Sequence, residues 1–197
     1  DVQGNKAKAM ALANFGKLCQ QNGDFGMALS KYLEAEKLYF IDNNIPGLIG
    51  IYSSLGDLYD KILQPEKRKE INEKAFKLSK QTYDTVAIIK AVTGMATNLS
   101  NDDNFAEAIK MYQHAVDLSQ KTRNKQLEHV AWYDLGFAFS RLDDYEKAEE
   151  MYTKSYEVAL QTGNRMDIGD ALYKMGLMSL YSGNLKKSEE RLFEALE

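Results

Sequence analysis

The chain has 197 residues, 44% hydrophobic and 27% charged, which excludes an intrinsically disordered protein. A single cysteine excludes a disulfide scaffold and a cysteine-rich zinc site, and two histidines leave little for a histidine-based metal centre. The net charge of −4 offers no broad basic surface for nucleic acid, and no run of about 18 apolar residues predicts a membrane span. We therefore expect no metal, no cofactor, no nucleic-acid binding and no membrane insertion.

One small residue recurs every 40 positions along the whole chain, and other columns keep the same register. The small residues are Gly16, Gly56, Ala96, Gly136 and Gly176. Bulky residues precede them by four positions: Leu12, Tyr52, Val92, Trp132 and Leu172. A second small column stands twelve positions after them, at Ala28, Arg68, Ala108, Ala148 and Ser188. An aromatic column follows at Tyr32, Asn72, Tyr112, Tyr152 and Leu192.

This spacing predicts five repeats at about 5–40, 45–80, 85–120, 125–160 and 165–197. Apolar residues three, four and seven apart indicate two amphipathic helices in each repeat. In chain order, the turns inside the repeats are predicted at Gly23-Asp24, before Pro65, at Asp103-Asn104, at Asp143-Asp144 and at Gly183-Asn184. A helix pair cannot bury its apolar stripe alone, so successive pairs should stack into one continuous domain over residues 1–197.

The pattern of a bulky residue, Leu-Gly, an aromatic residue and then Ala, Tyr and Ala resembles the tetratricopeptide repeat family. The usual repeat of that family is about 34 residues, and the 40-residue subtype is similar to repeats of bacterial signalling proteins and regulators. The resemblance implies an all-α solenoid of ten helices in a right-handed superhelix. Repeat two departs most from the pattern, because Arg68 and Asn72 replace the small and aromatic residues; this puts the tight packing of its second helix in doubt.

No residue pattern supports catalysis. His114 and His129 fall inside predicted helices with no nucleophile at a turn nearby, and Cys19 is expected to be a small buried hydrophobe. The mixed acidic and basic residues of the outer helix faces indicate a solvated surface. We therefore expect no enzyme activity.

The resemblance also implies a binding groove lined by the first helix of each repeat. Its polar end carries Lys17, Asp57, Asp60 and Lys61, and its aromatic end carries Tyr133, Phe137, Arg141, Tyr173, Leu177 and Tyr181. Tyrosine combines apolar area with a hydroxyl, which suits an interface anchor. We expect this groove to hold a protein or peptide ligand, although a further helix of a longer chain is an equal candidate to cover its apolar end.

Two interpretations of the function stay open. The chain is either the partner-binding or sensory segment of a larger signalling or regulatory protein, or a free-standing scaffold or adaptor that assembles other proteins. The register starts and stops at repeat boundaries, so we expect a segment of a longer protein. We also expect a cytoplasmic location and self-association through the C-terminal end, where Leu192, Phe193 and Leu196 lack a polar cap.

Overall fold

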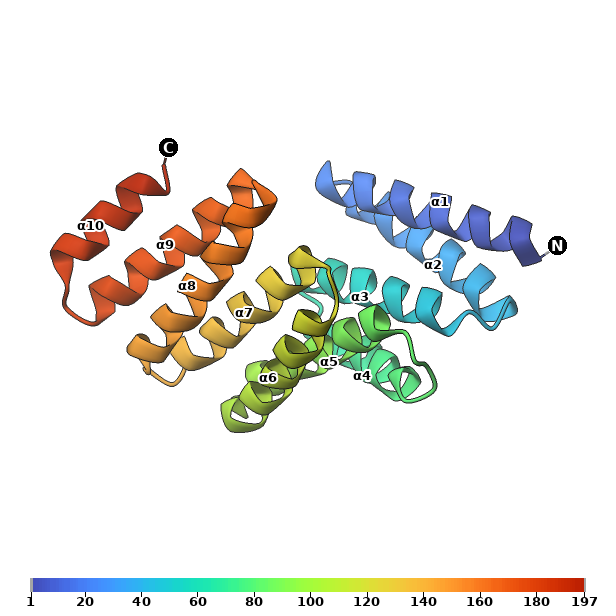
Figure 1. Cartoon of the computed structure of the whole chain (residues 1–197). Coiled ribbons are helices and arrows are strands. Elements are labelled where there is room, and N and C mark those ends of the chain that lie inside the picture. Colours follow the sequence, from blue (N-terminus) through green and yellow to red (C-terminus); the bar gives the residue numbers. More distant parts are fainter. Residues whose placement is uncertain (1, 197) are drawn as a thin grey trace. The chain divides into compact units, whose positions relative to one another are not determined.

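The computed structural model describes the backbone of residues 2–196 and the side chains of residues 4–196. Over that range the chain forms ten helices and no strand (Figure 1). They are α1 (Val2–Gln21), α2 (Phe25–Ile41), α3 (Ile45–Lys61), α4 (Pro65–Ser79), α5 (Thr85–Asn101), α6 (Phe105–Lys121), α7 (Lys125–Ser140), α8 (Tyr145–Thr162), α9 (Arg165–Tyr181) and α10 (Leu185–Glu194). The predicted all-α solenoid of helix pairs is confirmed.

The helices fall into two compact units. Unit 1 spans Asp1–Asn98 and unit 2 spans Leu99–Glu197, with the boundary inside α5. In unit 1, α1 packs on α2, α2 on α3 and α3 on α4. In unit 2, α6 packs on α7, α7 on α8, α8 on α9 and α9 on α10. First helices of successive repeats also touch, α1 with α3 and α7 with α9, so their outer residues form a shared face within each unit.

The turns inside the repeats follow the same 40-residue register as the helices. One residue in each turn is left-handed: Gly23, Leu63, Asp103, Asp143 and Gly183. The residue that follows caps the next helix in three of these turns, where Asp24, Asp144 and Asn184 accept a hydrogen bond from a backbone N–H of the first helical turn. Pro65 occupies the first turn of α4, as predicted.

The small columns let paired helices approach closely. Gly16, Gly136, Ala28 and Ala148 are all buried, as predicted. A Cβ atom at Gly16 would lie 2.7 Å from the Tyr32 ring, closer than side chains tolerate. Trp132 is 9% exposed and Cys19 is also buried, in agreement with the sequence analysis.

Repeat two packs tightly in spite of its unusual residues. Asn72, which replaces the aromatic residue, is buried and donates hydrogen bonds to the backbone oxygen of Gly94 and to Oδ1 of Asn98, both at 3.0 Å. Asn98 in turn donates to the backbone oxygen of Lys69 at 3.1 Å. The doubt raised by the sequence about the packing of this helix is resolved, because a polar network fills the space of a tyrosine ring.

Candidate functional site

The first-helix face of unit 2 carries the residues that the sequence assigned to the aromatic end of the groove. We call this surface the aromatic wall: Tyr133, Phe137, Tyr173, Leu177 and Tyr181. Residues four apart on α7 and on α9 lie on one side of each helix, and the two helices touch. Tyr173 is 49% exposed and Tyr181 is 57% exposed. These two rings are therefore the most accessible part of the wall.

The inner part of the wall also stabilises the fold. Tyr133 is half-buried and its ring meets the Tyr152 ring edge-on, with centroids 5.3 Å apart. Burial, followed by the nearby carboxylate of Asp170, raises the pKa of Tyr133 to about 12. Tyr133 and Leu177 pack against the buried cluster of Ala148, Tyr152, Met175 and Met178. The hydroxyl of Tyr133 consequently keeps its proton at neutral pH and can donate a hydrogen bond.

Arg141, which the sequence analysis placed at this end of the groove, and Tyr181 of the aromatic wall already have partners. Arg141 Nη2 lies 3.6 Å from Asp103 Oδ1, and the guanidinium lies 5.4 Å from the centre of the Phe105 ring. Tyr181 packs its ring 5.4 Å from that of Tyr145 on α8. Arg141 remains exposed, but a ligand carboxylate there would compete with Asp103.

The first-helix face of unit 1 is charged. Lys17, Asp57 and Lys61 are exposed there. Desolvation by the surrounding protein raises the pKa of Asp57 to about 6, although Lys90 opposes this shift. Asp57 thus changes charge near neutral pH, in spite of a side chain that reaches solvent.

Asp60 has a structural task. Its Oδ1 accepts a 3.0 Å hydrogen bond from Arg68, the large residue that replaces a small one in repeat two. The charge of Arg68 is thereby paired at the edge of the face. The sequence placed Asp60 in the groove but did not reveal this partner.

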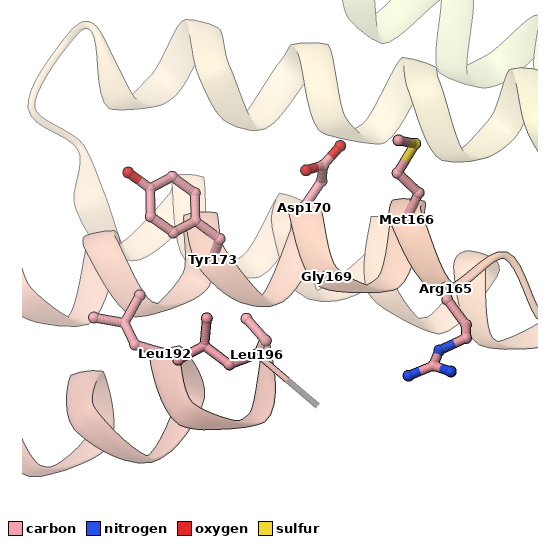
Figure 2. Close-up of a pocket in the computed structure, with 8 residues that line it drawn as sticks. Arg165, Met166, Gly169, Asp170, Tyr173, Leu192 and Leu196 are labelled. Carbon is pink, nitrogen blue, oxygen red and sulfur yellow. The ribbon is translucent and has the colours of Figure 1, made fainter.

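A pocket of about 480 Å³ lies between α9 and α10 (Figure 2). Its lining residues are Arg165, Met166, Gly169, Asp170, Tyr173, Leu192, Ala195 and Leu196. Figure 2 shows Tyr173, Asp170 and Met166 on the same side of α9. Of these residues, the sequence-based groove included only Tyr173. Asp170 stands six positions before the small residue Gly176, and Lys90 stands six positions before Ala96 in repeat three. A charged residue at this register position was the sequence signal that could have pointed to Asp170.

Three chemically suggestive residues meet in the interior of unit 2. Ser155 Oγ lies 2.8 Å from His129 Nδ1 and donates to the backbone oxygen of His129 at 3.1 Å. His129 Nε2 lies 3.7 Å from Asp167 Oδ1. The residue types match a serine nucleophile with its base, but Ser155 is 0% exposed, so no substrate can reach it. The cluster instead joins α7, α8 and α9, a role for His129 that the sequence did not predict.

The described residues show neither a metal site nor a membrane span. Among them, no group of three or more His, Cys, Asp or Glu side chains is placed to hold a metal ion. None of their helices is both long and apolar enough to cross a lipid bilayer.

Solved structures confirm the fold. BtubC (BKLC) from P. vanneervenii matches with a TM-score of 0.77 and 22% identity, over 98% of this chain and 80% of its own. A Rap protein complexed with competence and sporulation factor matches with a TM-score of 0.83 and 15% identity, over 96% of this chain and 53% of its own. A signal transduction ATPase of the STAND type with a tetratricopeptide repeat sensor, from Pyrococcus horikoshii, matches with a TM-score of 0.75 and 19% identity, over 95% of this chain and 28% of its own.

The sequence comparisons identify the family. A comparison with curated proteins finds no match. The family model described as tetratricopeptide repeat matches residues 87–161 and 127–197, which together make up more than half of the chain. Together with the 40-residue register and the stacked helix pairs, this match shows that the chain belongs to the tetratricopeptide repeat family.

Proposed function

We propose that the chain is a protein- or peptide-binding module and that the aromatic wall of unit 2 is its main contact surface. The observation that carries the proposal is the exposure of Tyr173 and Tyr181 on one helix, beside the half-buried Phe137 and Leu177. Rigid aromatic side chains on a helix face offer large contact area at little cost in conformational entropy, and such residues dominate the binding energy of interfaces.

The charged face of unit 1 is proposed as a secondary contact surface. Lys17, Asp57 and Lys61 bear charges of both signs and are exposed. Exposed charges contribute little affinity, but they discriminate between partners and affect association rates. Because Asp57 titrates near pH 6, a ligand cation held there would bind more weakly as the pH falls below that value.

Within this function, we favour the partner-binding or sensory segment of a larger signalling or regulatory protein, located in the cytoplasm. The support is that the chain spans only about half of the Rap protein, which was solved with a bound factor, and a smaller part of the STAND protein, whose repeats are described as a sensor. The alternative of a free-standing scaffold is supported by BtubC, most of whose length the chain covers. Identifying the domains of the full-length protein would separate the two roles.

A display library of short random peptides, selected against the chain, tests the binding function directly. We expect enriched peptides to contain an aliphatic or aromatic anchor. Phe137→Ala and Tyr181→Ala should each weaken the best peptide by about 1–3 kcal/mol, measured by titration calorimetry. Phe40→Ala is the matched control, because Phe40 is an equally apolar, exposed ring at the end of α2 in unit 1.

Two results would contradict the proposal. One is that no peptide is enriched above background. The other is that a double Phe137→Ala, Tyr181→Ala variant with an unchanged helical circular dichroism spectrum binds the peptide as tightly as the unaltered chain.

A further inference from the structure

The pocket between α9 and α10 has a counterpart 40 residues earlier in the chain, and α9 fills that counterpart. Gly169, Leu192 and Ala195 correspond by register to His129, Tyr152 and Ser155 of repeat four. All three repeat-four residues are buried. α9 packs on both helices of repeat four and brings Asp167 to 3.7 Å from His129. By register, the pocket therefore lies where the first helix of a repeat packs on the repeat before it.

Helix α1 exposes the face that a first helix buries in this position. In α9, the residues Ala171, Met175 and Met178 are buried, and their register counterparts in α1 are Ala11, Phe15 and Leu18. All three counterparts are exposed in α1, Phe15 at 48% and Leu18 at 57%. At the Leu18 position every later repeat has a buried residue: Leu58, Asn98, Ala138 and Met178. Ala11, Phe15 and Leu18 lie three, four and seven positions apart, so they share one side of α1 and give it an apolar face.

The pocket and helix α1 also have residues of opposite charge beside them. In unit 2, Glu149 of α8 accepts hydrogen bonds from Lys187 at 2.5 Å and from Arg191 at 2.6 Å, which fastens the second helices of successive repeats. Glu189 of α10 holds the same repeat position as Glu149, and Lys31 of α2 holds the same repeat position as Arg191. Glu189 is exposed and Lys31 is half-buried beside Glu34, with which it forms a 2.7 Å ion pair. An acidic residue beside the pocket therefore has a basic counterpart beside α1.

We propose that the pocket between α9 and α10 binds helix α1 of a second copy of this chain, in the manner in which α9 sits on repeat four. Phe15 and Leu18 of one copy would cover Leu192 and Ala195 of the other, and Tyr173 would become half-buried, as Tyr133 is. The two contacting surfaces differ, so the interface is heterologous and leaves one pocket and one α1 face free at the ends of the assembly. Association should therefore continue beyond the dimer as concentration rises. Tyr173 lines the pocket and also belongs to the aromatic wall, so the self-association and the proposed ligand share this residue. Phe137 and Tyr181, the positions altered in the ligand test, do not line the pocket.

Sedimentation velocity over a concentration series of the 197-residue chain tests the proposal. We expect the average mass to rise steadily with concentration. Leu18→Glu on α1 or Ala195→Glu in the pocket should each weaken association about tenfold or more, because each puts an unpaired charge into a desolvated contact. Leu160→Glu is the control, since Leu160 is an exposed apolar residue of α8 outside both surfaces, and it should leave association unchanged.

Mixing the two variants gives the sharper result. The Leu18→Glu chain keeps an intact pocket and the Ala195→Glu chain keeps an intact α1 face. An equimolar mixture should therefore form a one-to-one dimer that does not grow further. In the same way, Glu189→Lys should weaken association a few-fold and Lys31→Glu in the other copy should restore it.

Several results would overturn the proposal, provided that circular dichroism shows folded variants. A chain that stays monomeric at its highest soluble concentration contradicts it. So does a mixture of the two variants that stays monomeric. Loss of association with Ala195→Glu but not with Leu18→Glu would show instead that the pocket meets another pocket, in a symmetric dimer.

Discussion

Repeats two and four fill the same interior position with opposite chemistry. In repeat four, Tyr152 lies against Gly136, where a Cβ atom would come within 3.0 Å of the ring, and the tyrosine is 0% exposed. In repeat two, Asn72 takes the position of the tyrosine, and a Cβ atom at Gly56 would lie 2.7 Å from its Oδ1. Both glycines are needed for close approach, although one faces a ring and the other an amide.

The difference shows what the repeat requires at this position. A ring fills the position mostly with apolar surface, whereas a buried amide needs a hydrogen-bond partner for its polar atoms. Asn72 meets that condition through Gly94 and Asn98, which belong to the following repeat. Both repeats thus use the following repeat at this position, Asn72 through hydrogen bonds to repeat three and Tyr152 through apolar packing against Met175 and Met178 of repeat five.

The largest expected effect comes from emptying the aromatic position of repeat four. Tyr152→Ala removes a fully buried ring and should lower the free energy of unfolding by about 3–5 kcal/mol, because a cavity remains beside Gly136. Urea denaturation followed by circular dichroism measures this change. Glu157→Ala, at an exposed position of the same helix, is the control. A loss below that of Asn72→Ala would break the comparison.

Removing the amide of repeat two should cost less. Asn72→Ala removes the hydrogen bonds that the Gly94 backbone oxygen and Asn98 Oδ1 accept, and we expect the free energy of unfolding to fall by about 1–3 kcal/mol in the same assay. The double change Asn72→Tyr with Asn98→Met rebuilds the chemistry of repeats four and five at the matching positions. The double variant should lose less free energy of unfolding than the sum of the losses of Asn72→Tyr alone and Asn98→Met alone. An additive result would show that the network is not a unit.

The charged contact at Glu149 should produce a smaller and pH-dependent effect. Burial alone would raise the pKa of Glu149, but the hydrogen bonds from Lys187 and Arg191 lower it overall from its ordinary value of 4.5. A lowered pKa in the fold stabilises the protein above that value, and the stabilisation disappears as the pH falls through the folded pKa.

Glu149→Gln should therefore cost about 1–2 kcal/mol at pH 7, and the difference from the unaltered chain should shrink towards pH 3. Denaturation at several pH values measures it. Glu150→Gln is the control, because Glu150 belongs to an exposed surface pair and should cost little. A difference that does not change with pH would show that the charge of Glu149 is not what stabilises repeat four.

The smallest effect concerns Asp57 on the first helix of repeat two. Its register position is the one that Phe137 holds in repeat four. Asp57 has a raised pKa of about 6, so the fold favours its protonated form and loses stability as the pH rises from about 4 through 6. Asp57→Asn should remove that loss, with a gain at pH 7 of less than about 1 kcal/mol because the side chain is exposed. Glu73→Gln, also exposed in unit 1, should show no such trend. An Asp57→Asn chain no more stable at pH 7 than at pH 4, relative to the unaltered chain, would contradict the assignment.

The helices, turns and buried columns were predictable because each depends on residues close together in one repeat. Gly136 and Trp132 stand four apart on one helix, and Pro65 and Asp144 mark helix starts by their own backbone chemistry. The network around Asn72 was not predictable, because its partners lie 22 and 26 residues away. The network also stands where the family pattern has an aromatic residue, so the pattern gives no indication of it.

The candidate site was predictable in outline only. The register predicted that Tyr173 and Tyr181 lie on the first-helix face, and both side chains are exposed. It could not show that the Tyr133 ring packs against Tyr152 or that Arg68 donates a hydrogen bond to Asp60. The pocket depends on how the end of α10 returns past Gly169, where the Ala195 carbonyl lies 3.5 Å from the position of a Cβ atom. Such a return is a property of helix packing, and no single sequence column encodes it.

The left-handed residue in each turn inside a repeat has a consequence for the folding rate. Because the chain reverses within a few residues, each helix meets its partner at short sequence separation, and little loop entropy is lost before apolar contacts form. Leu63 alone among these turn residues is neither glycine nor aspartate, and an L-residue with a bulky side chain is strained at its φ of 55°. Closure of the turn in repeat two should therefore be slower than in the other repeats. The chain as a whole should nevertheless fold quickly, as proteins of low contact order do, with nucleation at any of the other turns.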